Sequence, residues 1–246
     1  MAGSEGPDVR LLGVPLLGVL GGMGPMATVD FLRKLVEATP AARDQDHLAV
    51  MVAQAADIPD RTRAILGEGP DPLPAMTLAL RRLEAAGATR LAIPCNTAHH
   101  WHGALQALTP VPILHIVDAV AAGLARRGLA GGPVGLLATD GTLRSGLYPR
   151  HLGRHGFTCR VPADQAAVMR AVRLVKAGQG AQARPLLEAA AAGLVAEGCR
   201  QVVMACTEIP LALADPAGPA SAVLLDATDA LARACVAAAA PARRAA

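Results

Sequence analysis

Two stretches of this 246-residue chain share one plan, and this apparent duplication is the feature that most limits the possible folds. Residues 87–97 and 198–208 each begin with a glycine that would end a helix, continue with a short apolar run and reach a cysteine followed by polar residues. Glycine and cysteine are eight residues apart in both. Because α/β proteins bind ligands beyond the carboxyl ends of their strands, a thiol from each half is expected at a binding site. Cys95 and Cys206 therefore predict chemistry from two sides of one substrate.

Strand-like apolar runs alternate with helical patterns along the whole chain, which predicts parallel sheets covered by helices on both faces. The strand-like runs are 16–20, 47–53, 91–94, 111–115, 134–138 and 201–205, and the helical segments are 27–38, 71–86, 119–127, 146–155, 164–177, 181–197 and 226–239, with a turn at 139–142. The order restarts at 135–141, which resembles 18–24. We expect two similar Rossmann-like α/β subdomains related by pseudo-symmetry, with the active site in the cleft between them. The expected division is residues 1–112 with 220–246, and 113–219.

The composition fits a globular protein and argues against several classes of partner. Apolar residues make up 52% of the chain, but aromatic residues only 2%, so there are few rings on which nucleic-acid bases could stack. The net charge of +3 is too small to indicate a polyanionic partner. Five cysteines, an odd number, favour a reducing compartment. The apolar stretch 11–22 lacks the basic segment that precedes a signal sequence, and no run is long enough to span a bilayer. We expect a cytoplasmic protein with no nucleic-acid or membrane partner.

Residues 22–27 formally fit the glycine pattern of dinucleotide-binding loops. The second strand, however, is followed by Gln54 and not by the acidic residue that would bind a ribose, and Pro25 removes a backbone donor from the turn. A nicotinamide or flavin cofactor is therefore not expected. The loop still offers free N–H groups to a small carboxylate.

Buried cysteines often serve only as small apolar residues, and this interpretation is adopted for three of them: Cys159, Cys199 and Cys235. Cys95 and Cys206 differ because each would lie at a strand end before a helix start. A helix N-terminus lowers the pKa of a thiol and favours the thiolate. We expect both to be functional.

The neighbourhood of Cys95 also suggests two other kinds of site. His99, His100 and His102 follow it closely, which is compatible with a metal site or with a Cys–His hydrolase dyad. No second cluster of cysteine or acidic residues completes a metal site, and a dyad leaves Cys206 unexplained. Neither a metal nor a hydrolase is expected.

Two basic residues are candidates for binding an anionic substrate. Arg61 follows the second strand behind a stiffening proline and could clamp a carboxylate with two hydrogen bonds. Lys176, the only lysine of the second half, lies near the end of a helical stretch rich in apolar residues. On its own, Lys176 is weak evidence for a site that binds an anion.

Four motifs in this order resemble the aspartate/glutamate racemase family: residues 21–31, 58–62, 94–99 and 205–211. The resemblance extends from about residue 16 to about residue 229 and is greatest to the aspartate racemase branch. It implies two similar α/β domains with the site in the cleft, and racemisation by two bases without pyridoxal phosphate or another cofactor. It also implies a small dicarboxylic amino acid as substrate and a homodimer.

The same resemblance implies roles for individual residues. Cys95 and Cys206 match the catalytic pair, while Arg61 and Lys176 match the basic residues that recognise the side-chain carboxylate of aspartate. The positions that match those holding the polar groups of the amino acid are Met23, Gln54, Asn96, Thr97 and Thr207, with Thr139 and Thr142 on the loop of the second half.

Residues 53–57 depart from the family pattern, in which Asn or Ser followed by Pro often comes after the second strand. This departure leaves a glutamate-specific or broad-specificity racemase open. Related chemistry on the same scaffold includes maleate isomerases and arylmalonate decarboxylases, although two cysteines argue against a decarboxylase that needs one. A non-catalytic binder of small carboxylates is the remaining alternative.

Overall fold

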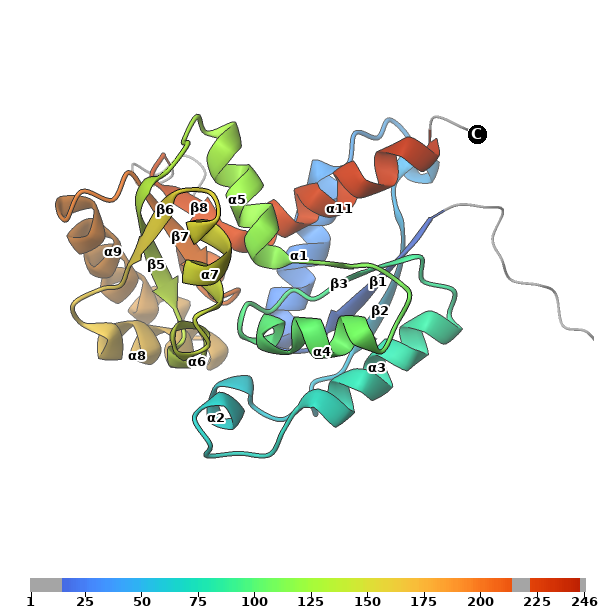
Figure 1. Cartoon of the computed structure of the whole chain (residues 1–246), viewed down its shortest axis with the longest axis horizontal. Coiled ribbons are helices and arrows are strands. Elements are labelled where there is room, and N and C mark those ends of the chain that lie inside the picture. Colours follow the sequence, from blue (N-terminus) through green and yellow to red (C-terminus); the bar gives the residue numbers. More distant parts are fainter. Residues whose placement is uncertain (1–14, 214–221, 244–246) are drawn as a thin grey trace, which may run out of the picture.

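The computed structural model describes residues 15–213 and 222–243, which form two four-stranded parallel sheets covered by helices (Figure 1). The first sheet has the strand order β2-β1-β3-β4, and the second has the order β6-β5-β7-β8. These two orders are the same once the strands of the second sheet are counted from β5. The α/β class and the duplication expected from the sequence are both confirmed.

The first half alternates strands and helices as the apolar pattern predicts. Its elements are β1 (Leu16–Gly21), α1 (Pro25–Ala38), the 3-10 turn η1 (Asp44–Asp46), β2 (Ala49–Gln54), α2 (Arg61–Ile65), α3 (Leu73–Ala85), β3 (Arg90–Ala92), the 3-10 turn η2 (Thr97–Trp101), α4 (His102–Ala107) and β4 (Ile113–Leu114). β1 lies in the middle of the sheet, and all but its first residue are buried. Such burial requires an apolar strand, and the sequence of β1 is apolar throughout.

The second half repeats the arrangement around β5. Its elements are α5 (Ile116–Arg126), β5 (Gly132–Ala138), α6 (Asp140–Arg144), α7 (Leu147–Gly153), β6 (Phe157–Arg160), α8 (Gln165–Lys176), α9 (Gly180–Ala196), β7 (Gln201–Ala205), α10 (Pro210–Leu213), β8 (Leu224–Asp226) and α11 (Ala227–Arg243). The glycines of the duplicated motif follow helix ends in both halves, Gly87 with φ 86° and Gly198 with φ 89°. Glycine adopts this left-handed conformation without steric cost, and each glycine leads the chain into the next strand.

Strand pairing differs from the expected division at both of its boundaries. β4, at 113–114, pairs with β3 in the first sheet, and β8, at 224–226, pairs with β7 in the second. β6 and β8 were not predicted because neither has a long apolar run: β6 alternates buried and exposed residues, and β8 has three residues. The predicted turn at 139–142 is the start of helix α6.

Three helices hold the two sheets together. α11 leaves the second sheet, runs beside α1 of the first half and also packs against α5 (Figure 1). One apolar core draws residues from both sheets and from these helices, including Phe31, Val120, Leu136 and Leu231. Each half has a further core of its own on the other face of its sheet. The two halves are therefore joined on one side and open onto a cleft elsewhere.

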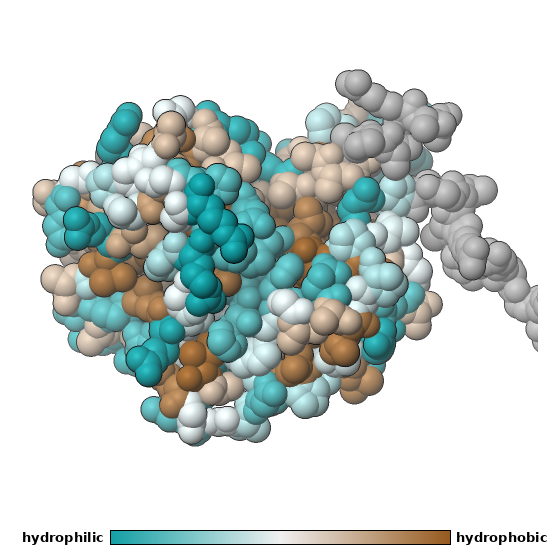
Figure 2. All heavy atoms as spheres, viewed as in Figure 1, coloured by the Kyte–Doolittle hydropathy of each residue, from teal (hydrophilic) through white to brown (hydrophobic). Residues whose placement is uncertain are grey.

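The surface is mixed in polarity. Figure 2 shows hydrophilic and hydrophobic residues interspersed on one face, with a continuous hydrophilic strip over the region of α7. Within the described residues, no helix is both long enough and apolar enough to cross a membrane.

Candidate active site

A narrow cleft lies between the carboxyl ends of the two sheets, and both cysteines of the duplicated motif line it. It is lined by Met23, Asp60, Arg61, Thr62, Cys95, Asn96, Thr97, Thr139, Lys176, Cys206, Thr207 and Glu208. Residues of the two halves face each other across it, as the duplication predicts. Asp60, Thr62 and Glu208 are lining residues that the sequence analysis did not select.

Cys95 reaches the cleft from the first sheet. β3 ends at Ala92, and the chain turns sharply with a hydrogen bond of 2.8 Å from the Cys95 N–H to the carbonyl of Ile93. The 3-10 turn η2 then begins at Thr97. Cys95 is only 6% exposed, so a substrate that reaches its thiol is shielded from water.

Cys206 reaches the cleft from the second sheet, directly after β7, and its thiol donates a hydrogen bond of 3.1 Å to Oε2 of Glu208. Burial raises the pKa of Cys206 well above its usual value, and the carboxylate of Glu208 raises it further. The expectation that a helix N-terminus lowers this pKa is wrong. The following helix, α10, has four residues and begins four residues later, so burial and the carboxylate prevail.

Glu208 is buried, with a side chain only 7% exposed. Its Oε1 has no hydrogen-bond partner among the described residues, and the nearest cation is Nζ of Lys176 at 3.8 Å. Sequence reasoning missed the interaction of Glu208 with Cys206, because the effect of a carboxylate two positions after a cysteine depends on whether both side chains are buried. In the structure, Glu208 accepts a hydrogen bond from Cys206 and opposes ionisation of its thiol.

Three threonine hydroxyls form a hydrogen-bonded triangle across the cleft. Oγ1 of Thr97 lies 2.9 Å from both Thr139 Oγ1 and Thr142 Oγ1, which are 3.0 Å from each other. Thr139 also caps α6 by accepting a hydrogen bond from the Thr142 N–H. The triangle joins the Cys95 loop of the first half to the β5–α6 turn of the second. All three threonines, predicted as site residues, come together here.

Arg61 is the first residue of α2, and its side chain is 9% exposed. Nη1 donates to the carbonyls of Ile58 and Pro59, at 3.0 and 2.9 Å, which fixes the guanidinium. Nε has no hydrogen-bond partner, and Arg61 forms no ion pair within 15–213 and 222–243. A buried guanidinium with a free donor is suited to receive a carboxylate.

Asn96 is held in place from the second half. Its Oδ1 accepts a hydrogen bond of 2.6 Å from the hydroxyl of Tyr148 on α7. Burial raises the pKa of Tyr148, so the phenol remains a donor. The Nδ2 group of Asn96 is buried without a partner in the described part of the chain. The residue before it is Cys95, so this bond also fixes the thiol loop.

Of two predicted site residues in the first half, Met23 lies in the cleft lining and Gln54 lies outside it. Met23 lines the cleft, on a loop where Gly22 has φ 90° and passes so close to the backbone of Ala55 that no side chain fits. Gln54 does not line the cleft; it is exposed, and its amide lies 3.4 Å from the carbonyl of Pro25. Gln54 ends β2, an edge strand, and its side chain lies against Gly21 of β1 and the start of α1.

The other three cysteines do not line the cleft. Cys199 and Cys235 are buried in apolar cores, and burial raises the pKa of Cys235 to about 12. Cys159 lies on β6, where burial raises its pKa to about 11. All are thiols that pack against their neighbours.

Comparison with known families and structures identifies the relatives of this chain. A sequence model described as Asp/Glu/Hydantoin racemase matches residues 20–235. The chain belongs to the Asp/Glu/Hydantoin racemase family. An aspartate racemase from Picrophilus torridus has a similar structure, with a TM-score of 0.81 and 31% sequence identity over 92% of this chain and 94% of that one. This similarity extends over both halves of the racemase-family chain and therefore includes its cleft.

Relatives named for other substrates also match. The broad specificity amino-acid racemase RacX of Bacillus subtilis is 28% identical over 156 residues, 57% of this chain and 62% of RacX. A glutamate racemase of Ectopseudomonas mendocina is 35% identical over 164 residues, 63% of this chain and 60% of that protein. The chain thus spans less than two thirds of the length of these two relatives. Family membership leaves the substrate open.

Proposed function

We propose that this member of the racemase family interconverts the enantiomers of a dicarboxylic amino acid, with aspartate as the first candidate, and that it needs no cofactor. The observation that carries the proposal is the pair of buried thiols, Cys95 and Cys206, which line one cleft from opposite halves. Two bases on opposite faces of a carbon are what inversion at that carbon requires. Arg61 and Lys176 in the same cleft favour a substrate with two carboxylates.

In the proposed reaction, one cysteine as thiolate removes the α-proton and becomes a thiol, while the other, as thiol, delivers its own proton to the opposite face of the carbon. The raised pKa of Cys206 makes it the proton donor of the resting enzyme. In the reverse direction Cys206 as thiolate is the base and Cys95 as thiol is the acid, which is the protonation state that a forward turnover leaves. Glu208, which accepts the Cys206 S–H at 3.1 Å, favours the return of the proton to Cys206.

The α-proton of an amino acid is a weak acid, so the site must stabilise the negative charge that moves onto the α-carboxylate. The polar groups of the Cys95 and Cys206 loops, Asn96, Thr97 and Thr207, are available for this purpose. They are preorganised: the threonine triangle holds Thr97, and Tyr148 holds Asn96. Fixed donors in a cleft shielded from water stabilise developing charge more than mobile donors in water do.

The test of racemisation is an incubation with L-aspartate in D₂O, with a reducing agent and without pyridoxal phosphate. Solvent deuterium at the α-carbon, followed by NMR, and D-aspartate, detected by chiral chromatography, are both expected. Cys206→Ala and Cys95→Ala should each abolish inversion, while Cys235→Ala is the matched control and should retain it. If Cys206→Ala racemised at the wild-type rate, the two-base assignment would be wrong.

The substrate class is tested at Arg61. Arg61→Met removes charge-assisted hydrogen bonds to the side-chain carboxylate, worth about 1.5–3 kcal/mol, so kcat/KM for aspartate should fall by about 10- to 100-fold while that for alanine changes little. The matched control is Arg63→Met on the same helix, because Arg63 binds the carbonyl of Glu68 at the exposed surface. An equal loss for aspartate and alanine would contradict the role of Arg61.

A glutamate or broad-specificity racemase is the second candidate, since a glutamate racemase and a broad specificity amino-acid racemase are among the relatives that match the chain. The position of Gln54 outside the cleft supports it, because the departure from the family pattern lies at that strand end. Chiral assays with aspartate, glutamate and several neutral amino acids at equal concentration distinguish the two. A kcat/KM at least about tenfold higher for aspartate would exclude broad specificity.

A further inference from the structure

Four of the seven histidines gather beside the α5–α7 contact, outside the residues that line the cleft. His99 and His102 come from η2 and α4, His115 precedes α5, and His151 is on α7. His115 is the centre of the group: its ring centroid lies 4.9 Å from that of His99, 4.6 Å from that of His102 and 4.0 Å from that of His151. His151 is far from the other three in the sequence, so the fold brings it to the cluster.

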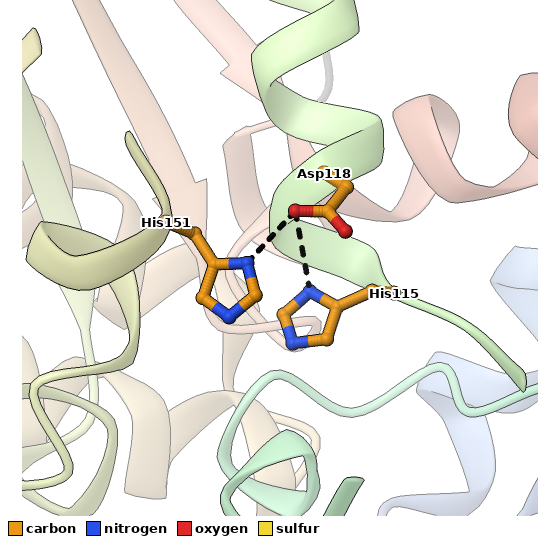
Figure 3. A group of neighbouring side chains, drawn as sticks. All are labelled: His115, Asp118 and His151. Atoms are coloured by element: carbon orange, nitrogen blue, oxygen red, sulfur yellow. Dashed lines mark hydrogen bonds and ion pairs between the residues drawn. The ribbon is translucent and has the colours of Figure 1, made fainter. Parts of the chain in front are cut away.

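Three side chains of this region point their ligand atoms toward one another. Nδ1 of His151 lies 2.8 Å from Oδ1 of Asp118, and Nδ1 of His115 lies 4.0 Å from the same oxygen (Figure 3). The three atoms are all within 4.8 Å of one another. A bound ion about 2 Å from each ligand needs ligand atoms at such separations.

The surroundings fix His115 but leave one side of the group open. His99 and His102 contact its ring edge-on, and Nε2 of His102 is anchored 2.9 Å from the carbonyl of Ile113. His115 and His151 are 7% and 19% exposed, whereas Asp118 is 60% exposed. A solvent ion can therefore enter beside Asp118.

We propose that His115, Asp118 and His151 bind a divalent transition-metal ion of the zinc class. Two imidazoles and one carboxylate are a donor set that zinc accepts, with a fourth position left to water. Nδ1 of His115 accepts a hydrogen bond of 3.2 Å from the Val117 N–H, so this nitrogen has a lone pair to donate to an ion.

Binding would replace two hydrogen bonds in this group. His115 Nδ1 accepts a bond of 3.2 Å from the Val117 N–H at the start of α5, and His151 is bonded to Asp118. The stacked rings, 12° from parallel, also have to rotate to direct both nitrogen atoms at one ion. The ion would tie α5 to α7 and stabilise the folded chain in proportion to its affinity.

The test is a zinc titration of the full chain by calorimetry after removal of metal with a chelator, with thermal unfolding followed in parallel. Because thiolates also bind zinc, the titration uses a Cys95→Ser/Cys206→Ser background. One Zn²⁺ per chain and a raised Tm are expected. His151→Asn and Asp118→Asn should each weaken binding by at least about tenfold, since each removes one of three ligands.

His155→Asn is the matched control, because His155 is exposed four residues beyond His151 and lies outside the cluster. It should bind Zn²⁺ as the background protein does. Binding absent in the Cys95→Ser/Cys206→Ser background, or weakened equally by His155→Asn, would overturn the proposal. Since neither readout measures turnover, failure of the metal site and failure of the racemase proposal remain separate results.

Discussion

At the scale of single residues, the two cysteines of the cleft differ in their surroundings although they occupy equivalent positions in the duplicated halves. Cys206 has a carboxylate two residues later whose Oε2 accepts its S–H, whereas Cys95 is followed by Asn96 and Thr97. The carboxylate of Glu208 and burial both disfavour the thiolate of Cys206. The duplication thus supplies two thiols, and in the proposed reaction the carboxylate of Glu208 keeps Cys206 as the acid.

Glu208→Gln tests this difference. Without the carboxylate, the negative charge that opposes ionisation is gone and Lys176 still favours the thiolate, so the pKa of Cys206 should fall. The pH at which Cys206 begins to react with iodoacetamide, followed by peptide mass spectrometry, should move downward. The wild-type thiol should need more alkaline solution, because it stays protonated until pH approaches its raised pKa.

Glu188→Gln is the control, since Glu188 lies on α9 and forms only a surface ion pair with Arg184. It should leave the alkylation profile of Cys206 unchanged. An unshifted or upward-shifted profile in Glu208→Gln would show that burial alone sets the pKa of Cys206.

The sequence predicted the residues of the site better than their interactions. Equal glycine-to-cysteine intervals were sufficient to select Cys95 and Cys206, because a repeated α/β unit places equivalent residues at equivalent strand ends. The effect of Glu208 on a thiol could not be predicted, because it depends on burial of both groups. The place of Gln54 outside the cleft lining could not be predicted either, because it depends on the contact of its side chain with the carbonyl of Pro25.

At the scale of secondary-structure elements, the cleft depends on a close approach between α2 and α6, which belong to different halves. Gly141, near the start of α6, lies against this contact. A Cβ there would be 2.8 Å from Cα of Thr62 and 3.0 Å from Cγ2 of Thr97. Both distances are shorter than ordinary carbon contacts, so any other residue pushes the two sides apart.

Gly141→Ala should therefore lower kcat/KM by about tenfold or more, since displacing site residues by about 1 Å can cost up to about 100-fold. Gly193→Ala is the control: it lies inside α9 with no atom within 4 Å of the added methyl group. That change should leave activity intact and raise the free energy of unfolding by up to about 1 kcal/mol. Activity measured beside urea unfolding separates the two effects, and full activity in Gly141→Ala would contradict the close-contact argument.

Elements with strong local signals were predicted from the sequence, and short ones were not. β1, β5 and β7 are buried apolar strands in the interiors of their sheets, and long helices such as α8 and α9 have clear ends. The edge strands β6 and β8 form because the central strands offer them hydrogen-bonding partners, which no local pattern reveals. The histidine cluster escaped prediction in the same way, since its members meet only in the folded chain.

At the scale of the whole molecule, a buried ion triad helps to hold the two halves in register. Lys34 of α1 lies between Asp30, on its own helix, and Asp226, at the end of β8 in the second sheet. Lys34 is 6% exposed and Asp226 14%. A cation so placed compensates two carboxylates from opposite halves, next to the α1–α11 contact.

Lys34→Met should destabilise the protein by about 3–5 kcal/mol, because it leaves the buried Asp226 without its cation and Asp30 with Arg33 alone. Arg33→Met, one residue earlier, is the matched control: Arg33 is 51% exposed and pairs with the exposed Glu37 and with Asp30, which keeps Lys34, so its loss should cost less than about 1 kcal/mol. Urea unfolding at pH 7 measures the stability of both variants.

If the triad also sets the relation between the halves, KM for aspartate should rise in Lys34→Met and stay unchanged in Arg33→Met. Equal stability of the two variants would mean that the apolar core shared by both sheets, and not Lys34, holds the halves together.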